Sequence, residues 1–253
     1  MKKKWLWLVC AVLLGASGGL RAQGSDTLRV EDGLYLVRLT DFVYVWTSYK
    51  QMEGYGNVGA NGLLVAVDKK AMLIDSPWDE PRTERLCKYI TDSMHLELII
   101  AVVTHAHDDR IGGIGYLKRQ YIPVYALEST TMEAKRLNIP RPDIIFNDSL
   151  SLNFVGVQVL LLDPGPGHTH DNMVVWIPVE RVLYGGCFIR DGAATDLGNL
   201  SEADPKSWLE SAGRVSTRFP EAVYVVPGHG KPGGPELIQH TIELLQNYKA
   251  ADH

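Results

Sequence analysis

Residues 104–110 read Thr-His-Ala-His-Asp-Asp-Arg and follow directly on a nearly continuous apolar run, residues 96–103. Such a run predicts a strand that is buried on both faces. Two histidines two residues apart, with a carboxylate two residues further on, cannot share one face of a helix, but they can converge where a strand turns into a loop. Imidazole and carboxylate groups are natural zinc ligands, and α/β folds place their sites at the carboxyl ends of strands. This segment therefore predicts a metal site.

Three more candidate ligands lie where an apolar run ends beside glycine. They are His168 in the segment Pro-Gly-Pro-Gly-His-Thr, Cys187 in Leu-Tyr-Gly-Gly-Cys and His229 in Val-Val-Pro-Gly-His-Gly. Glycine allows the backbone to turn tightly and to approach a bound ion closely. Four such segments, each at the exit of a predicted strand, indicate that these strand ends meet at one metal centre.

The remaining apolar runs predict the architecture. We expect strands at residues 34–39, 42–47, 62–67, 71–74, 96–103 and 123–125 in the first half, and at 151–154, 157–162, 173–177, 181–184 and 222–226 in the second. We expect helices at residues 79–94, 115–120, 127–137, 205–218 and 235–249, with Asp79 capping the first. Each half is then a set of strands followed by alternating strands and helices. This order predicts one α/β domain with two packed sheets and helices outside, a four-layer αββα sandwich.

Residues 1–22 have the order of a secretory signal peptide: three lysines, an apolar run at residues 5–16 and small residues up to Ala22. The apolar run is shorter than the roughly 20 residues that a membrane-spanning helix needs. We therefore expect cleavage near Ala22, export to the periplasm and a single mature domain, residues 23–253, without a membrane anchor. An uncleaved N-terminal anchor is the alternative interpretation.

The 25 basic and 30 acidic residues give a formal net charge of −5, which argues against nucleic acid as the main partner. The three cysteines are too few for a fold held together by disulfides. We interpret Cys87 as a small buried hydrophobe on a helix. A Cys87–Cys187 disulfide is the alternative in an oxidising compartment, and it would remove Cys187 as a metal ligand. No strongly apolar surface helix is evident, so we expect a monomer.

These residues resemble the zinc sites of the metallo-β-lactamase family, and specifically of its subclass with three histidines at one zinc ion and Asp-Cys-His at the other. The resemblance extends over essentially the whole mature chain, and it implies the metallo-β-lactamase fold with two Zn²⁺ ions per subunit. It implies these ligand sets: His105, His107 and His168 for the first ion, and Asp109, Cys187 and His229 for the second. Relatives such as glyoxalase-type hydrolases place a histidine where Arg110 stands and an aspartate where Cys187 stands.

The resemblance further implies a zinc-dependent β-lactamase. Such an enzyme hydrolyses the β-lactam amide of penicillins, cephalosporins and carbapenems, and thereby confers antibiotic resistance. Two zinc ions can share a hydroxide at neutral pH, because coordination lowers the pKa of water to about 7. Asp109 would bind zinc and also orient this nucleophile. The chain has no Ser-x-x-Lys motif that would supply a serine nucleophile instead.

Two polar residues resemble the family's substrate contacts. Arg190 lies three residues after Cys187, where the family usually carries a lysine that pairs with the substrate carboxylate. Arginine can form this pair as a bidentate fork, although its reach and geometry differ from those of an ammonium group. Asn199 matches a residue that can donate a hydrogen bond to the carbonyl oxygen as it becomes anionic.

Residues 51–60 resemble the mobile flap over the substrate. This glycine-containing loop carries three apolar side chains, Met52, Tyr55 and Val58, which suit a cover over the bound molecule. A simple hairpin connection is the alternative interpretation.

Two other functions stay open at this point. A zinc-binding or partner-binding protein can keep a fold without turnover, but loss of catalysis usually removes a ligand, and all six ligands are present. A hydrolase of the same fold could instead act on thioesters or other esters. Arg110 and Cys187 count against that alternative.

Overall fold

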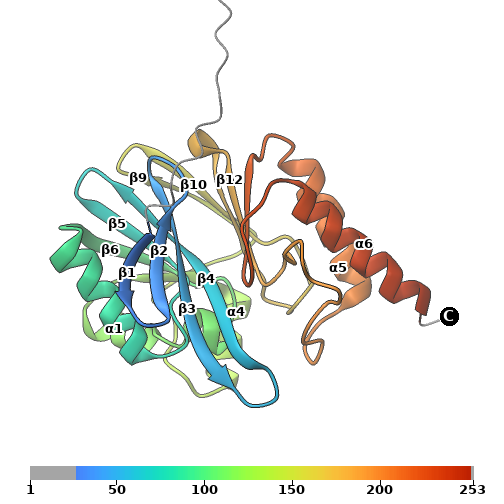
Figure 1. Ribbon diagram of the computed structural model, residues 1–253, viewed down its shortest axis with the longest axis horizontal. Helices are drawn as coiled ribbons and strands as arrows, with labels where there is room; N and C mark the ends of the chain where they lie inside the picture. Colours follow the sequence, from blue (N-terminus) through green and yellow to red (C-terminus); the bar gives the residue numbers. More distant parts are fainter. Residues whose placement is uncertain (1–26, 252–253) are drawn as a thin grey trace, which may run out of the picture.

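Two sheets form the centre of the computed structural model, which describes residues 27–251 (Figure 1). The expected signal peptide, residues 1–22, lies outside the described residues. None of the described helices is both long enough and apolar enough to cross a membrane.

The first sheet has eight strands, which are hydrogen-bonded in their order along the chain. They are β1 Thr27–Glu31, β2 Leu34–Arg38, β3 Val43–Met52, β4 Gly56–Val67, β5 Lys70–Ile74, β6 Glu97–Val102, β7 Val124–Leu127 and β8 Ile144–Phe146. Neighbours pair antiparallel from β1 to β5 and parallel from β5 to β8. The segment that follows β6 therefore leaves the sheet on the same edge as the segments that follow β5 and β7.

The second sheet has five strands in the order β13-β12-β11-β10-β9. They are β9 Ser149–Phe154, β10 Val157–Leu162, β11 Val174–Ile177, β12 Val182–Gly186 and β13 Tyr224–Pro227. Only β12 and β13 pair parallel; the other neighbours are antiparallel. The carboxyl ends of β10, β12 and β13 consequently point in the same direction.

Helices cover the outer face of each sheet. They are α1 Glu80–Lys88, with the π-helical turn η1 Tyr89–Ser93, then α2 Asp108–Ile111, α3 Ile114–Arg119, α4 Glu128–Arg136, the 3₁₀ turn η2 Pro178–Glu180, α5 Pro205–Arg218 and α6 Glu236–Ala251. Leu86 of α1 and Leu117 of α3 belong to the core on the outer side of the first sheet. Trp208 of α5 and Leu237 of α6 belong to the core on the outer side of the second, where Figure 1 shows both helices.

Alternation along the strands separates these cores. Leu63 and Val65 of β4 lie in the core between the sheets, whereas Leu64 packs toward the outer helices. Val175 of β11 likewise faces the first sheet, and Val174 faces α5 and α6. Because successive strand residues point to opposite faces, each sheet has two apolar faces to bury. The predicted four-layer αββα sandwich is confirmed.

Several element predictions are confirmed in detail. Asp79 caps α1, since its Oδ1 accepts the main-chain N–H of Arg82 at 3.0 Å. Helix α5 spans the predicted residues 205–218. The predicted order, in which each half is a set of strands followed by alternating strands and helices, is confirmed, although the two sheets have eight and five strands. Strands β1 and β8 were not predicted. Both lie at the edges of the first sheet, where side chains need no regular alternation of buried and exposed positions, so their sequences carry no strand pattern.

The prediction of a loop at residues 51–60 is also wrong for the backbone. Strand β3 reaches Met52, β4 starts at Gly56, and these two residues pair across the hairpin. A tight turn containing Gly54, whose φ is +78°, joins the strands. The polar and glycine-rich composition concealed the strands because an antiparallel ladder is made by backbone groups and tolerates such side chains. The alternative interpretation, a hairpin, describes this segment.

Candidate metal centre

The carboxyl ends of four strands bring the six predicted ligands together. Strand β6 leads into the first two histidines, and the aspartate lies in the first turn of α2. The other three follow β10, β12 and β13 of the second sheet. The ligands in chain order are His105, His107, Asp109, His168, Cys187 and His229. Because both sheets contribute, the centre spans the junction between them.

The three-histidine set converges on one point. His105 Nε2 and His168 Nε2 each lie 3.2 Å from His107 Nδ1. The rings are close to perpendicular, with centroids 4.7 to 5.3 Å apart. A tetrahedral zinc ion with Zn–N distances of about 2.0–2.1 Å places its ligand nitrogens about 3.3 Å apart. The three nitrogens therefore fit a zinc ion.

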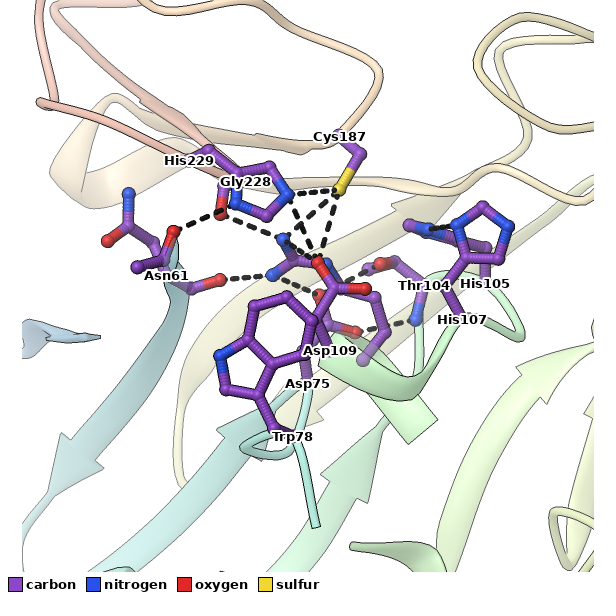
Figure 2. Close-up of polar contacts among 12 residues, drawn as sticks. Asn61, Asp75, Trp78, Thr104, His105, His107, Asp109, Cys187, Gly228 and His229 are labelled. Carbon is purple, nitrogen blue, oxygen red and sulfur yellow. Dashed lines mark hydrogen bonds and ion pairs between the residues drawn. The ribbon is translucent and has the colours of Figure 1, made fainter. Parts of the chain in front are cut away.

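The ligand atoms of the Asp-Cys-His set are also spaced like the ligands of a single zinc ion. Cys187 Sγ lies 3.3 Å from His229 Nε2 and 3.6 Å from Asp109 Oδ2, and the last two atoms are 3.1 Å apart (Figure 2). Thiolate, imidazole and carboxylate around zinc give ligand separations of about 3.3 to 3.6 Å. His105 also groups with Asp109 and with Cys187 within 4.8 Å. The two sets are thus adjacent and can hold a pair of metal ions.

The ring of His229 is held from behind by strand β4. Its Nδ1 lies 2.8 Å from the carbonyl oxygen of Gly59, which directs Nε2 toward the second ligand set. The Asn61 side chain donates to the carbonyl oxygens of Pro227 at 3.0 Å and Gly230 at 2.8 Å, on either side of the histidine. Such partners fix the tautomer and orientation of a metal-binding histidine. Asn61 was not among the predicted site residues, because its only signal in the sequence is a single amide in an otherwise apolar run.

Glu202 performs the same task for the first ligand set. Its Oε2 lies 2.8 Å from His107 Nε2, so that Nδ1 faces the other two histidines. The second carboxylate oxygen accepts a hydrogen bond from Arg136 of α4 at 3.4 Å. Glu202 was not among the predicted site residues, because the segment before α5 has no sequence pattern that relates it to the ligands.

Arg110 is fully buried among the residues of the second ligand set. Its guanidinium donates to Cys187 Sγ at 3.1 Å, to the Gly228 carbonyl oxygen at 2.8 Å and to Tyr184 Oη at 2.9 Å. It also forms an ion pair of 2.9 Å with Asp109. The planar guanidinium directs its N–H groups at several acceptors in one fixed plane, a geometry that the ammonium group of a lysine does not offer. Arg110 therefore fixes the relative positions of two ligands and the backbone beside a third.

Asp75 holds the start of the segment that carries the first histidines. Its two carboxylate oxygens accept hydrogen bonds from the N–H of Thr104 at 2.7 Å and the Thr104 hydroxyl at 2.8 Å (Figure 2). The Tyr184 hydroxyl donates to the same carboxylate at 2.6 Å. Asp75 follows β5 and Tyr184 lies in β12, so this network joins the two sheets beneath the metal centre.

Gly228 permits the closest backbone approach in the centre. A Cβ atom at this position would lie 2.6 Å from both Arg110 Nη2 and the main-chain nitrogen of Cys187. Such contacts are too short for any side chain, so the segment that carries His229 can reach Cys187 only with glycine here. The expected role of glycine beside the ligands is borne out at this position.

Burial and charge set the protonation of the ligands in the metal-free protein. Burial, with the neighbouring imidazoles, lowers the pKa of His105 well below its usual range and that of His168 to about 3. Burial would raise the pKa of Asp109, but Arg110 and then His229 hold it well below its usual range. His105 and His168 are therefore neutral and Asp109 is ionised at neutral pH, as zinc requires. Burial lowers the pKa of His229, yet Cys187 and Asp109 outweigh it and raise that pKa to about 10.

The low pKa of His168 predicts an acid-sensitive metal-free protein. The unfolded chain takes up a proton at the usual pKa of about 6.5, whereas the folded histidine stays neutral down to a pKa of about 3, so stability is lost as the pH falls below 6.5. We expect the free energy of unfolding in chelator to fall more between pH 7 and pH 5 than that of His168→Gln, by roughly 1 to 2 kcal/mol. Urea titrations at both pH values measure this. The exposed His170→Gln should behave as wild type, and parallel profiles for wild type and His168→Gln would contradict the assignment.

Cys87 and Cys187 both lie where the sequence predicted them, the first in a core and the second among the candidate ligands. Cys87 and Cys187 are buried and free, so the alternative of a disulfide between them is wrong. Burial raises the pKa of the Cys87 thiol to about 12, as suits a core side chain on α1. Only Cys187 lies among the ligands.

The two polar side chains predicted to bind substrate make their contacts within the loop that follows Cys187. Arg190 turns toward Asp196, donating from Nε to its carbonyl oxygen at 3.2 Å with 3.8 Å between the charged groups. Asn199 is exposed, and its Oδ1 accepts the main-chain N–H of Ser201 at 3.1 Å. Neither contact involves a metal ligand. Their roles toward substrate stay predictions.

The tip of the β3–β4 hairpin places its apolar side chains unequally. Tyr55 is 74% exposed at the turn, whereas Met52 and Val58 are partly buried. Val58 pairs with Lys50, whose Nζ lies 5.6 Å from the centre of the Trp78 ring.

Comparison with known proteins agrees with this centre. The model of the family described as the metallo-beta-lactamase superfamily matches residues 55–229. A protein of Bacteroides fragilis named metallo-beta-lactamase type 2 is 40% identical over 237 residues, which are 94% of this chain and 95% of that protein. A protein of the same name from Elizabethkingia meningoseptica is 34% identical over 98% of this chain and 97% of its own length. The solved structure of a metallo-beta-lactamase from Pontibacter korlensis, 38% identical, superposes with a TM-score of 0.82 over 85% of this chain and 99% of that one. Two complete ligand sets, the αββα sandwich and these similarities together show that the chain belongs to the metallo-beta-lactamase superfamily.

Proposed function

We propose that this chain is a zinc-dependent β-lactamase that hydrolyses the amide bond of a β-lactam ring. The observation that carries this proposal is the adjacency of two complete zinc ligand sets, one of three histidines and one of Asp109, Cys187 and His229. The names of the two relatives described above support the substrate class. His105, His107 and His168 would hold the first ion.

Zinc bound in these sets supplies Lewis acidity and makes water nucleophilic at neutral pH. The protein supplies positioning. Among the described residues, the hydrogen bonds and ion pairs of Asp109 all use Oδ2, with Arg110, His229 and Cys187 as partners. Its Oδ1 is then available to accept a hydrogen bond from the attacking water and to orient it toward the substrate carbonyl carbon. Asp109 thus acts both as ligand and as catalytic residue.

Two side chains on the loop after Cys187 would bind the substrate itself. Arg190 would pair with the carboxylate of the β-lactam, in exchange for its present contact with Asp196. Asn199, exposed nine residues further on, would donate from its amide to the carbonyl oxygen as negative charge develops there.

The β3–β4 hairpin would cover the bound substrate. Met52 and Val58 share one face of the hairpin with Lys50, because Met52 pairs with Gly56 and Val58 with Lys50. That face is the one from which Lys50 reaches Trp78, and the Trp78 ring lies 6.3 Å from the ring of His229. We therefore expect Met52 and Val58 to lie on the face of the hairpin that is turned toward the metal centre, with Tyr55 at the tip.

The mature protein would consist of residues 23–253 as a single catalytic domain. The lysines and apolar run at its N-terminal side support export to the periplasm, with removal of residues 1–22 as a signal peptide. A small-molecule β-lactam and two Zn²⁺ ions are then its partners, and it would act as a monomer. Confinement to the periplasm would place the enzyme where it protects a cell from antibiotics.

Hydrolysis assays test the proposal directly. We expect the purified mature chain loaded with zinc to hydrolyse nitrocefin and a carbapenem. We also expect chelation to abolish turnover, and added zinc to restore it, because no serine nucleophile replaces the metal. The colour change of nitrocefin and the loss of ultraviolet absorbance of the carbapenem measure both. Absence of hydrolysis in the zinc-loaded protein, turnover indifferent to chelator, or preference for a thioester over every β-lactam would each overturn the proposal.

A further inference from the structure

The main-chain amides on either side of His105 are each held by a buried carboxylate. The last ladder hydrogen bond runs from the Val103 N–H to the Tyr125 carbonyl oxygen at 2.9 Å. Beyond it, the Thr104 N–H donates to Asp75 at 2.7 Å, as described above. The Ala106 N–H donates to Asp171 Oδ2 at 3.0 Å.

Ala106 is the single residue between the histidines of the His-x-His segment, and it is 4% exposed. Its amide is buried where the strand has ended, so it needs an acceptor from another segment. A shift of this amide would move both neighbouring imidazoles, because they are attached to the adjoining peptide units. The Asp171 carboxylate therefore holds the peptide that sets the positions of His105 and His107.

Asp171 belongs to the loop that presents the third histidine, three residues after His168. Its carbonyl oxygen accepts a hydrogen bond from the Thr130 hydroxyl of α4 at 3.2 Å. The next residue, Asn172, closes the loop: its Oδ1 accepts the Thr169 N–H at 2.8 Å and its Nδ2 donates to the Gly165 carbonyl oxygen at 3.2 Å. The segment from His168 to Asp171 is thus braced within itself and against α4.

We propose that Asp171 is a positioning residue for the first zinc ion. Through its hydrogen bond with the Ala106 amide, Asp171 locks the loop of His168 to the His105–His107 segment. This inference rests on the proposed zinc sites. One hydrogen bond between segments 65 residues apart then sets the relative positions of all three histidines before the metal arrives. Preorganisation of this kind raises metal affinity, because less conformational freedom is lost on binding.

The burial of the carboxylate is consistent with this role. Asp171 is 6% exposed, and its hydrogen bond with the Ala106 amide offsets part of the cost of removing the carboxylate from water. A neutral amide side chain of the same shape retains one oxygen that can accept the Ala106 N–H. Asp171→Asn should therefore keep much of the function that Asp171→Ala loses.

Zinc affinity tests the proposal separately from turnover. Metal-free wild type, Asp171→Ala and Asp171→Asn are titrated with zinc against a chromophoric chelator that resolves two binding events. We expect Asp171→Ala to weaken one event by about 10- to 100-fold and Asp171→Asn to weaken it by less. In Co²⁺-loaded protein, the thiolate-to-metal charge-transfer band of Cys187 reports the second site, and we expect it to keep wild-type intensity in both variants.

Asp143→Ala is the matched control, because Asp143 Oδ2 also accepts a main-chain N–H, that of Val124 at 3.1 Å, outside the metal centre. It should leave both zinc affinities unchanged. If Asp171→Ala does not fold, Thr130→Val removes only the hydroxyl that braces the Asp171 main chain, and it should weaken the same event. Unchanged affinity in the folded variants, equal loss at both sites, or equal loss in Asp171→Asn and Asp171→Ala would overturn the inference. Absence of zinc binding by wild type would instead overturn the proposed function.

Discussion

Replacement of Cys187 by serine is expected to remove the second zinc ion and most of the activity. The Cys187 sulfur lies 3.3 Å from His229 Nε2 and 3.6 Å from Asp109 Oδ2, so it completes this ligand set. A serine hydroxyl does not ionise at neutral pH and is a weaker zinc ligand than a thiolate. Because a catalytic metal contributes several kcal/mol to transition-state stabilisation, we expect kcat/KM to fall roughly 100- to 1000-fold. Bound zinc should fall from two ions per chain toward one.

Metal analysis after dialysis and nitrocefin kinetics measure the two effects on one preparation. Cys87→Ala is the matched control, because this buried thiol on α1 is free and lies in the outer core of the first sheet. It should keep both zinc ions and wild-type turnover per folded molecule. Two zinc ions with wild-type kcat/KM in Cys187→Ser would contradict the assignment of this ligand set.

Replacement of Arg110 by methionine is expected to have the largest effect on stability. The guanidinium is fully buried and bonded to Asp109, Cys187, Gly228 and Tyr184. The substitution keeps most of the apolar stem, but Asp109 loses its guanidinium partner and keeps the contacts with His229 and Cys187, and the Gly228 carbonyl oxygen loses its arginine donor. Removing one member of a buried ion pair typically costs about 3–5 kcal/mol, and we expect this loss in the free energy of unfolding of the metal-free protein.

Urea unfolding in chelator at neutral pH measures that loss. Arg136→Met serves as control, because the Arg136 side chain is 61% exposed and its ion pairs lie at the surface; its effect should stay within about 0.5 kcal/mol. Arg110→Lys should lie between the two, since an ammonium keeps the charge but cannot hold several acceptors in one plane. A loss below about 1 kcal/mol in Arg110→Met would show that the network does not support the fold. In that case the role of Arg110 would be confined to the metal ligands.

Local sequence patterns were sufficient to predict most strands and helices of the αββα sandwich. Helix α5 has its predicted bounds, and the signals for it lie within one segment: it starts at a proline, carries apolar residues at helical spacing and, as the structure shows, is capped by Asp204. The hairpin at β3 and β4 was mistaken for a loop because its strands are held by backbone pairing, with glycines and polar side chains near the tip. Strand β8 escaped prediction because three residues at a sheet edge show no periodicity.

The supporting residues of the metal centre were beyond the reach of local patterns. Asn61 bonds the carbonyl oxygen of Pro227, 166 residues further along the chain. Glu202 meets His107 across 95 residues, and Asp171 meets Ala106 across 65. Each is an ordinary polar side chain in its own segment. Only the folded chain reveals that its partner is a ligand or the peptide beside one.

The sequence by itself indicated six candidate ligands, because each stands in a recognisable context, the glycine-bordered exit of an apolar strand. Their division between two zinc ions is what the resemblance to the metallo-β-lactamase family implies. The tertiary structure decided how these side chains are oriented: Arg110 beside the second set, Glu202 and Asp171 around the first, and the Gly59 carbonyl behind His229. The physical reason is that ligand identity is a property of one residue, whereas orientation depends on hydrogen bonds and burial that arise only when distant segments pack together.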